Sequence, residues 1–167
     1  MDFKKITKAA FLLLAALVVS SFTFRYSKFD KQDNSRVHKS ISKTFMTNTY
    51  SLSPFVVNKK EFLVIQENDS ILGYTIITEA PSQYHHFDYY ILFNTKAEVL
   101  KIEILQYREN YGAEICSKRW LKKFFKISTE DYLEYNRNIN AISGATISVN
   151  SLKQDVFKIT NILKKGL

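Results

Sequence analysis

The sequence predicts an α+β domain in which helices pack against an antiparallel sheet of hairpins. Three observations lead to this class. β-Rich runs outnumber helical ones, they come in pairs joined by short polar turns, and the last segment repeats apolar residues at steps of three and four. The chain has 167 residues, of which 46% are hydrophobic. That composition is enough for one modest core and too little for two large domains.

The chain begins with a basic segment followed by an apolar one. Lys4, Lys5 and Lys8 precede the uncharged stretch 9–24, which is the pattern of a secretory signal or signal anchor. Under the positive-inside rule, the lysines stay in the cytoplasm and the remainder is exported. We therefore expect residues 1–26 to be a signal peptide or signal anchor. The domain is then expected on the extracytoplasmic face of the cell membrane, periplasmic or outer, or free after cleavage; a buried helix of a soluble domain is the alternative.

Residues 27–60 are expected to form a tether and a lead-in helix. The first of them are charged and lack periodicity, and weak helical spacing follows over 36–46. The folded domain is then expected over residues 61–167.

Two hairpins are expected in the first half of that domain. One joins the β-rich runs 61–66 and 71–78 through a polar turn, and the other joins 89–93 and 98–107. The stretch 81–88, between the two hairpins, is expected to be a loop.

Two helical segments are expected to follow. Apolar spacing predicts a first helix over 115–125. The clearest helix is the last, which is expected to begin at a small-residue segment near residue 143. Its apolar stripe is formed by Val149, Leu152, Val156, Ile159 and Leu163.

The segment Ser143-Gly144-Ala145-Thr146 is the informative one, because small residues here lead directly into a helix. We expect Ser143 to be the N-cap, which leaves backbone N–H donors at the positive end of the helix dipole. Phosphate is a natural ligand of such an end. Gly144 and Ala145 carry little side chain and let a large planar group or another protein approach the Thr146 hydroxyl. On these features alone, a simple capped turn is the plainer account.

With Ser148 two positions further on, this segment resembles the flavinylation motif of the FMN-binding domain family. That family includes the FMN-bearing subunits of the Rnf and Nqr ion-translocating complexes and smaller exported relatives. The resemblance implies that FMN is the cofactor, that Thr146 accepts it through its phosphate, and that Ser143, Gly144, Ala145 and Ser148 bind it. It also implies a partner, a dedicated flavin transferase that makes the bond from FAD with magnesium in its own site.

Two upstream segments agree with this resemblance. Residues 107–115, followed by Trp120 and Phe124, are similar to the family's second signature, a strand end with Glu and Gly that leads to an aromatic-rich helix. Leu72-Gly73-Tyr74 is similar to the strand that opens the domain. The resemblance therefore spans roughly residues 61–163.

The second signature implies that Glu109 and Gly112 line the flavin. Tyr107 and Tyr111 are candidates for stacking on its ring, although tyrosines mostly serve packing. One position departs from the family pattern, because Asn140 stands where an Asp usually lies six residues before the acceptor. Asn keeps the hydrogen-bonding shape and loses the charge. If the transferase reads that carboxylate, flavinylation is inefficient or needs a matched enzyme.

Other interpretations of the sequence have less support. The formal net charge of +8 suits nucleic acid, anionic lipid or an acidic protein, but no nucleic-acid-binding signature is present, so we expect no nucleic-acid partner. His85 and His86 with Asp88 are too few for a metal set, so no metal is expected and a solvated loop is the plainer reading. Cys116 has no disulfide partner, and we expect it to be buried on a helix face beside Trp120.

No nucleophile elbow, Walker loop or Rossmann fingerprint is present, so the sequence shows no stand-alone catalytic site. The resemblance implies an exported, membrane-associated flavoprotein for extracytoplasmic electron transfer, with a quinone- or cytochrome-linked redox partner in the membrane. Two alternatives remain open. One is a sensory or regulatory module whose flavin state alters a partner, and the other is a membrane-anchored interaction domain that has lost its flavin.

Overall fold

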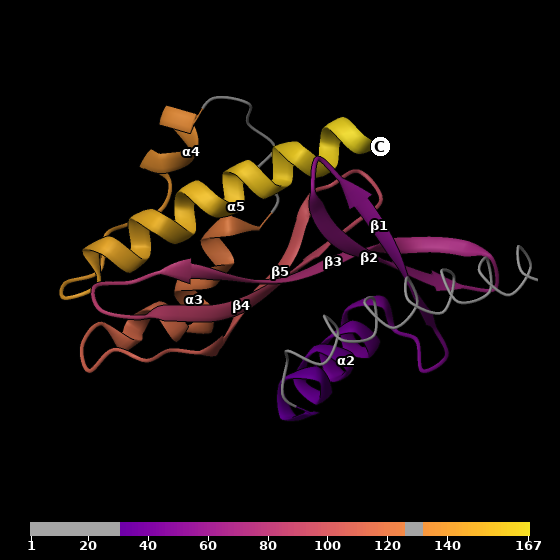
Figure 1. Ribbon diagram of the computed structural model, residues 1–167, viewed down its shortest axis with the longest axis horizontal. Helices are drawn as coiled ribbons and strands as arrows, with labels where there is room; N and C mark the ends of the chain where they lie inside the picture. The colour runs from indigo at the N-terminus through magenta and orange to yellow at the C-terminus, as the bar shows by residue number, and fades with distance from the viewer. Residues whose placement is uncertain (1–30, 126–131) are drawn as a thin grey trace, which may run out of the picture. The chain divides into compact units, whose positions relative to one another are not determined.

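The computed structural model describes residues 31–125 and 132–167 (Figure 1). The chain divides into two units, residues 1–39 and 40–167. The expected signal or anchor segment lies outside the described residues. Within the described ranges, no helix is both long enough and apolar enough to cross a membrane.

The second unit is built on one antiparallel sheet of five strands, which lie side by side in the order of the sequence. The strands are β1 (Ser51–Val57), β2 (Lys60–Glu67), β3 (Ser70–Pro81), β4 (His86–Phe93) and β5 (Val99–Gln106). Two of the hairpins turn over two residues that both have positive φ, first Asn58 and Lys59, then Asn68 and Asp69. Such turns match the twist of the strands and favour Asn and Asp, which explains their tightness.

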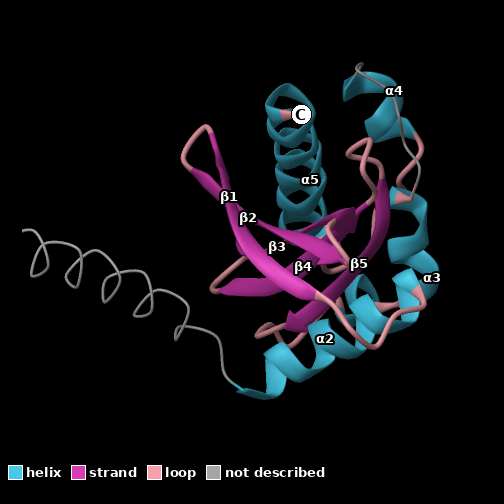
Figure 2. Cartoon of the chain, turned by 90° about the vertical axis from the view of Figure 1, so that its right-hand side faces the viewer, coloured by secondary structure: helices cyan, strands magenta, loops and turns pink. Residues whose placement is uncertain are grey.

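The helices differ greatly in length. They are α2 (Lys31–Phe45), the 3₁₀ turn η1 (Ala113–Cys116), α3 (Lys118–Leu121), the 3₁₀ turn η2 (Lys122–Phe124), α4 (Tyr132–Arg137) and α5 (Thr146–Gly166). The long helix α5 contacts β3 and β1, whereas η1, α3 and η2 contact the edge strand β5. In Figure 2, α5 runs behind the sheet and the short helices lie at the β5 side.

The core of this unit lies between the sheet and α5. All five residues of the apolar stripe expected on the last helix are buried, and β4 is buried along most of its length. Tyr89 of β4 is buried completely, and its hydroxyl donates to Asp155 Oδ2 of α5 over 2.6 Å. Burial first, and the Asp155 carboxylate second, raise the pKa of Tyr89 well above its ordinary value of 10.0. Strand and helix are thus joined by a polar contact as well as by apolar packing.

The α+β class, the antiparallel hairpins and the C-terminal helix are confirmed. Three details differ from the expectation. Strand β1 lies within the stretch expected to be tether and lead-in helix. The expected loop over 81–88 shrinks to 82–85, because β3 and β4 extend into it. The expected helix over 115–125 is interrupted, since Ser117 is extended between η1 and α3.

Candidate functional site

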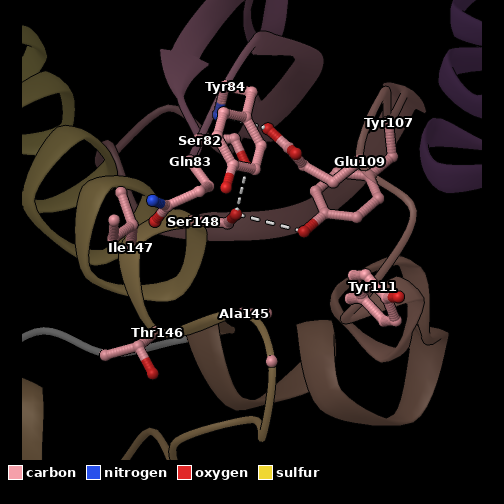
Figure 3. A pocket seen from close by; sticks show the side chains of 11 residues that line it. Ser82, Gln83, Tyr84, Tyr107, Glu109, Tyr111, Ala145, Thr146, Ile147 and Ser148 are labelled. Carbon is pink, nitrogen blue, oxygen red and sulfur yellow. Dashed lines mark hydrogen bonds between the residues drawn. The ribbon is translucent and has the colours of Figure 1, made fainter.

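A cavity of about 370 Å³ opens beside the start of α5 (Figure 3). Three segments that are far apart in the sequence meet there: the β3–β4 turn, the stretch that follows β5, and the first turn of α5. The lining residues are Ser82, Gln83, Tyr84, Tyr107, Glu109, Tyr111, Gly144, Ala145, Thr146, Ile147 and Ser148. Of the seven residues expected to bind the cofactor, five line this cavity, whereas Ser143 and Gly112 lie beside it.

Helix α5 begins at Thr146, and the N-cap is Ala145 rather than the expected Ser143. That expectation was wrong because Ser143 lies inside a β-turn over residues 142–145, in which the Ala145 N–H donates to Ile142 O over 3.2 Å. The helix begins only after this turn. Gly144 occupies the third position of this turn with φ 75°, where glycine avoids the steric cost of a left-handed backbone.

Among the described residues, the first turn of α5 begins with backbone N–H groups that precede the helical hydrogen-bond ladder. The helical ladder starts with the Val149 N–H, which donates to Ala145 O over 2.8 Å, so the N–H groups of 146–148 precede it. The Ala145 cap contributes no side-chain hydrogen bond from the described part of the chain. Thr146 is exposed at this end of the helix.

The contact with Ala145 explains why residue 112 is a glycine. A Cβ added to Gly112 would lie 2.4 Å from Ala145 Cβ and 2.9 Å from Gly144 O. Gly112 also has φ 74°, so its backbone favours glycine as well. Ala145 is 3% exposed. Its small size thus serves the contact with Gly112 as well as the space beside Thr146.

Ser148 is the centre of a chain of three hydroxyl groups (Figure 3). Its Oγ lies 2.5 Å from Ser82 Oγ and 3.1 Å from Tyr107 Oη. Ser148 is buried whereas Thr146 is exposed, so the two hydroxyls lie on different faces of the helix. The network joins the start of α5 to the β3–β4 turn and to the end of β5.

Glu109 lines the cavity, and its carboxylate also holds the β3–β4 turn. It accepts the backbone N–H groups of Tyr84 over 2.8 Å and His85 over 3.0 Å. The Tyr84 N–H is the main cause that lowers the pKa of Glu109; the His85 N–H and the Ser82 hydroxyl add to it, against a partial desolvation. The expected flavin-lining residue therefore also has a structural role.

Arg108, next to Glu109 in the chain, also contacts this part of the structure, at the start of β4. Its guanidinium donates to His86 O over 2.6 Å and pairs with the Asp88 carboxylate. Among the described residues, no three His, Cys, Asp or Glu side chains gather in a way that could hold a metal ion. His85 and His86 thus lie on a turn and strand start held by backbone contacts.

Two exposed tyrosines flank the cavity. Tyr84 is 81% exposed and Tyr111 is 78% exposed. Tyr107, the other aromatic candidate from the sequence, is half-buried and packs edge-on against Phe87. Sequence reasoning missed Tyr84, because only the pairing of β3 with β4 brings this turn to the start of α5.

Two further residues are placed by the structure. Cys116 is exposed, so the expectation that it is buried was wrong; it ends the 3₁₀ turn η1, just before Ser117 interrupts the expected helix. Asn140 is exposed, and its backbone oxygen accepts the Trp120 Nε1–H over 2.9 Å. This hydrogen bond ties the start of the small-residue motif to α3.

The fold and the site define a small α+β ligand-binding domain whose long helix begins, with no side-chain cap from the described residues, at a cavity. Residues 85–160 match the model of the FMN-binding domain family, so this part of the chain is an FMN-binding domain. FMN is accordingly its cofactor. A search of curated proteins finds no match to the chain. The turn residues Ser82, Gln83 and Tyr84 precede the matched region.

The residues present fit FMN. The N–H groups in the first turn of a 21-residue helix suit its phosphate. The cavity volume lies within the range of about 300–1,000 Å³ found for small-molecule sites. Tyr84 and Tyr111 offer aromatic surface to a planar ring.

Proposed function

We propose that this protein is an exported, membrane-associated flavoprotein that carries FMN on Thr146 and transfers electrons outside the cytoplasm. The observation that carries the proposal is the exposure of Thr146 on the first turn of α5, which has no side-chain cap from the described residues, beside a cavity in an FMN-binding domain. Attachment through Thr146, export and electron transfer go beyond the cofactor assignment.

The attachment is a phosphoryl transfer from FAD by a flavin transferase. The Thr146 hydroxyl oxygen attacks the FMN phosphorus of FAD, the bond from that phosphorus to the bridging oxygen breaks, and AMP leaves. The hydroxyl proton passes to a base of the transferase or to water. A threonine that is exposed at a helix end supports this step, because the modifying enzyme must reach it. The N–H groups of residues 146–148 would then stabilise the negative charge of the phosphodiester.

The remaining lining residues orient the ring and exclude water on one side. Tyr84 and Tyr111 would contact the flavin face, and the Ser82–Ser148–Tyr107 hydroxyl chain keeps the wall between them in place. When bound, FMN supplies the electron transfer itself, and the protein sets its position and potential. Glu109, the acid that lines the cavity, is hydrogen-bonded to the turn, which suits a carrier more than an acid–base enzyme.

Export and the redox partner follow from the rest of the sequence. The basic and apolar segment of residues 1–26 supports membrane tethering with the domain outside. A covalent bond suits an exported protein, since free FMN would be lost from the cell surface. A quinone- or cytochrome-linked membrane protein is the proposed electron partner.

Co-expression with a flavin transferase tests the covalent claim. We expect one flavin per chain that stays with the protein after acid precipitation. Flavin that washes away on denaturation would contradict the covalent bond and leave binding intact. Complete absence of flavin beside an active transferase would favour the interaction-domain reading, for which Asn140 is the sequence argument.

Topology is tested separately. A reporter that is active only in the cytoplasm, fused to the C-terminus, should give no signal, and a strong signal would contradict export. For electron transfer, the reduced protein is mixed with a quinone analogue and the flavin absorbance is followed. Rapid reoxidation under anaerobic conditions is expected, whereas a flavin that stays reduced would favour the sensory reading.

A further inference from the structure

A second hollow, of about 590 Å³, lies beside the C-terminal half of α5. It opens between that helix and the β1–β2 turn. The lining residues are Val57, Asn58, Phe157, Lys158, Asn161, Ile162 and Lys165. We refer to these seven residues as the basic groove. Figure 1 shows the end of β1 beside the last turns of α5.

The walls of the basic groove are fixed against each other. A Cβ on Gly166 would lie 2.6 Å from the Val57 methyl groups, so the helix end and the end of β1 are in close contact. Ile162 is buried and Phe157 partly buried in the core. The groove is therefore a preformed hollow with an apolar floor.

Lysines surround this floor. Lys158 and Lys165 line it, and Lys59, Lys60 and Lys164 lie on the same turn and the same last helical turns. In the residues that the structure describes, none of these five has an ion pair. The first carboxylate after the β1–β2 turn is Glu61, at the start of β2, and the carboxylate on α5 is Asp155, which accepts the Tyr89 hydroxyl. The end of the domain is strongly basic.

Apolar side chains accompany these charges at the surface. Leu167 is 54% exposed after α5, and Val57 and Phe157 of the lining are half-buried. A hollow with apolar walls and a basic rim is complementary to an apolar side chain that is flanked by carboxylates.

We propose that the basic groove binds a short acidic segment of another protein. An apolar side chain of that segment enters the hollow, and flanking carboxylates pair with Lys158 and Lys165. The basic groove is a hollow, which suits an apolar side chain that projects from a partner. A bilayer is bound by apolar side chains that protrude from the protein, so the groove favours a peptide over a membrane. The complementary charge provides orientation and a fast association rate.

This surface is independent of the flavin site. Lys158 and Lys165 follow Thr146 by 12 and 19 positions on the same helix, which places them roughly 18–28 Å away along its axis. A partner bound in the groove therefore leaves the flavin end of the domain open.

The test uses the full chain in a neutral detergent and a synthetic peptide with one leucine flanked by glutamates. Calorimetry should detect binding that weakens with salt, and a peptide with glutamines in place of the glutamates should not bind. The double variant Lys158→Gln/Lys165→Gln should bind about tenfold more weakly. The matched control, Lys118→Gln/Lys122→Gln, removes two exposed charges elsewhere and should bind like the parent.

A third variant tests the hollow without a change of charge. Asn161→Phe fills the groove from a half-buried position and should weaken peptide binding while the thermal unfolding curve is kept. Equal affinity of the parent and the Lys158/Lys165 double variant would overturn the proposal. It would also be overturned if mixed micelles with anionic lipid shift the amide signals of the groove while the peptide does not.

Discussion

Gly112 and Ala145 are in contact beside the cavity at the start of α5, so close that a Cβ on Gly112 would stand 2.4 Å from Ala145 Cβ. This contact joins the two sequence segments that resemble the family signatures, one after β5 and one at the start of α5. Both residues must be small, and Gly112 must also accept a left-handed backbone with φ 74°. The position of Thr146 therefore depends on the contact of Gly112 with Ala145.

Gly112→Ala should destabilise the domain by about 2–4 kcal/mol, since it combines overpacking with backbone strain. Gly144→Ala is the matched control. It has nearly the same φ, 75°, but its new Cβ would meet nothing closer than 3.6 Å, so we expect only about 1–2 kcal/mol. Urea unfolding of both variants measures the difference. Equal losses would contradict the close packing of Gly112 on Ala145.

Glu109→Ala should loosen the β3–β4 turn, because the N–H groups of Tyr84 and His85 lose their acceptor. Hydrogen exchange at these two amides should become faster, with amides in β4 as the reference. The pKa of Glu109 is lowered from its ordinary value of 4.5, so the parent's protection should be complete above pH 4.5. It should be lost as the pH falls through the lowered pKa. Protection that is the same in both proteins at neutral pH would refute this role.

Lys153→Met should stabilise the fold by about 1 kcal/mol. Lys153 is 5% exposed on α5, and burial lowers its pKa from the ordinary value of 10.5. Below the lowered pKa, the folded chain bears the full cost of a buried charge. That cost falls as the pH rises through the lowered value toward 10.5, so the advantage of methionine should disappear there.

Thermal unfolding of Lys153→Met at several pH values gives the measurement. The exposed Lys158→Met on the same helix is the control and should change stability by less than about 0.5 kcal/mol. A variant that gains nothing at neutral pH would mean that the Lys153 Nζ contact with Asn136 O offsets the burial of the charge.

Ser148→Ala should keep the flavin and lose about 1 kcal/mol of stability, because Ser82 and Tyr107 lose a shared hydrogen-bond partner. The Ser148 side chain is buried on a different face of α5 from Thr146. Denaturant unfolding and the flavin content per chain are measured on the same preparation. If Ser148→Ala kept its normal stability but lost the flavin, Ser148 would serve flavin binding and not the stability of the fold.

The sequence predicted those parts of the fold that depend on local pattern. The stripe from Val149 to Leu163 predicted α5, and alternating apolar residues predicted the hairpins. Strand β1 was missed because Pro54 and the surrounding polar residues weaken its alternation. Its place as a strand comes from pairing with β2, a non-local contact that no window of sequence contains.

The residues of the candidate site also fall into two groups, those that a local sequence pattern predicts and those that only the fold brings together. Thr146 and its small neighbours were predicted from a contiguous motif, whereas Tyr84 and Ser82 were not. They reach the site only because β3 and β4 pair in one register and deliver their turn to the start of α5. Ser143 was assigned as the cap on residue type alone. The turn that displaces it depends on the positive φ of Gly144.

The mass of the peptide that contains residue 146 tests the central claim most directly. After co-expression with an active flavin transferase, the parent and Ser148→Ala should carry FMN on this peptide. Asn140→Asp should carry as much or more, because it restores the family's usual carboxylate. Thr146→Val keeps the β-branched shape and removes the oxygen that forms the ester, so its peptide should be unmodified while the protein stays folded. FMN mass on Thr146→Val, or its loss in Ser148→Ala alone, would contradict the assignment of Thr146 as the acceptor.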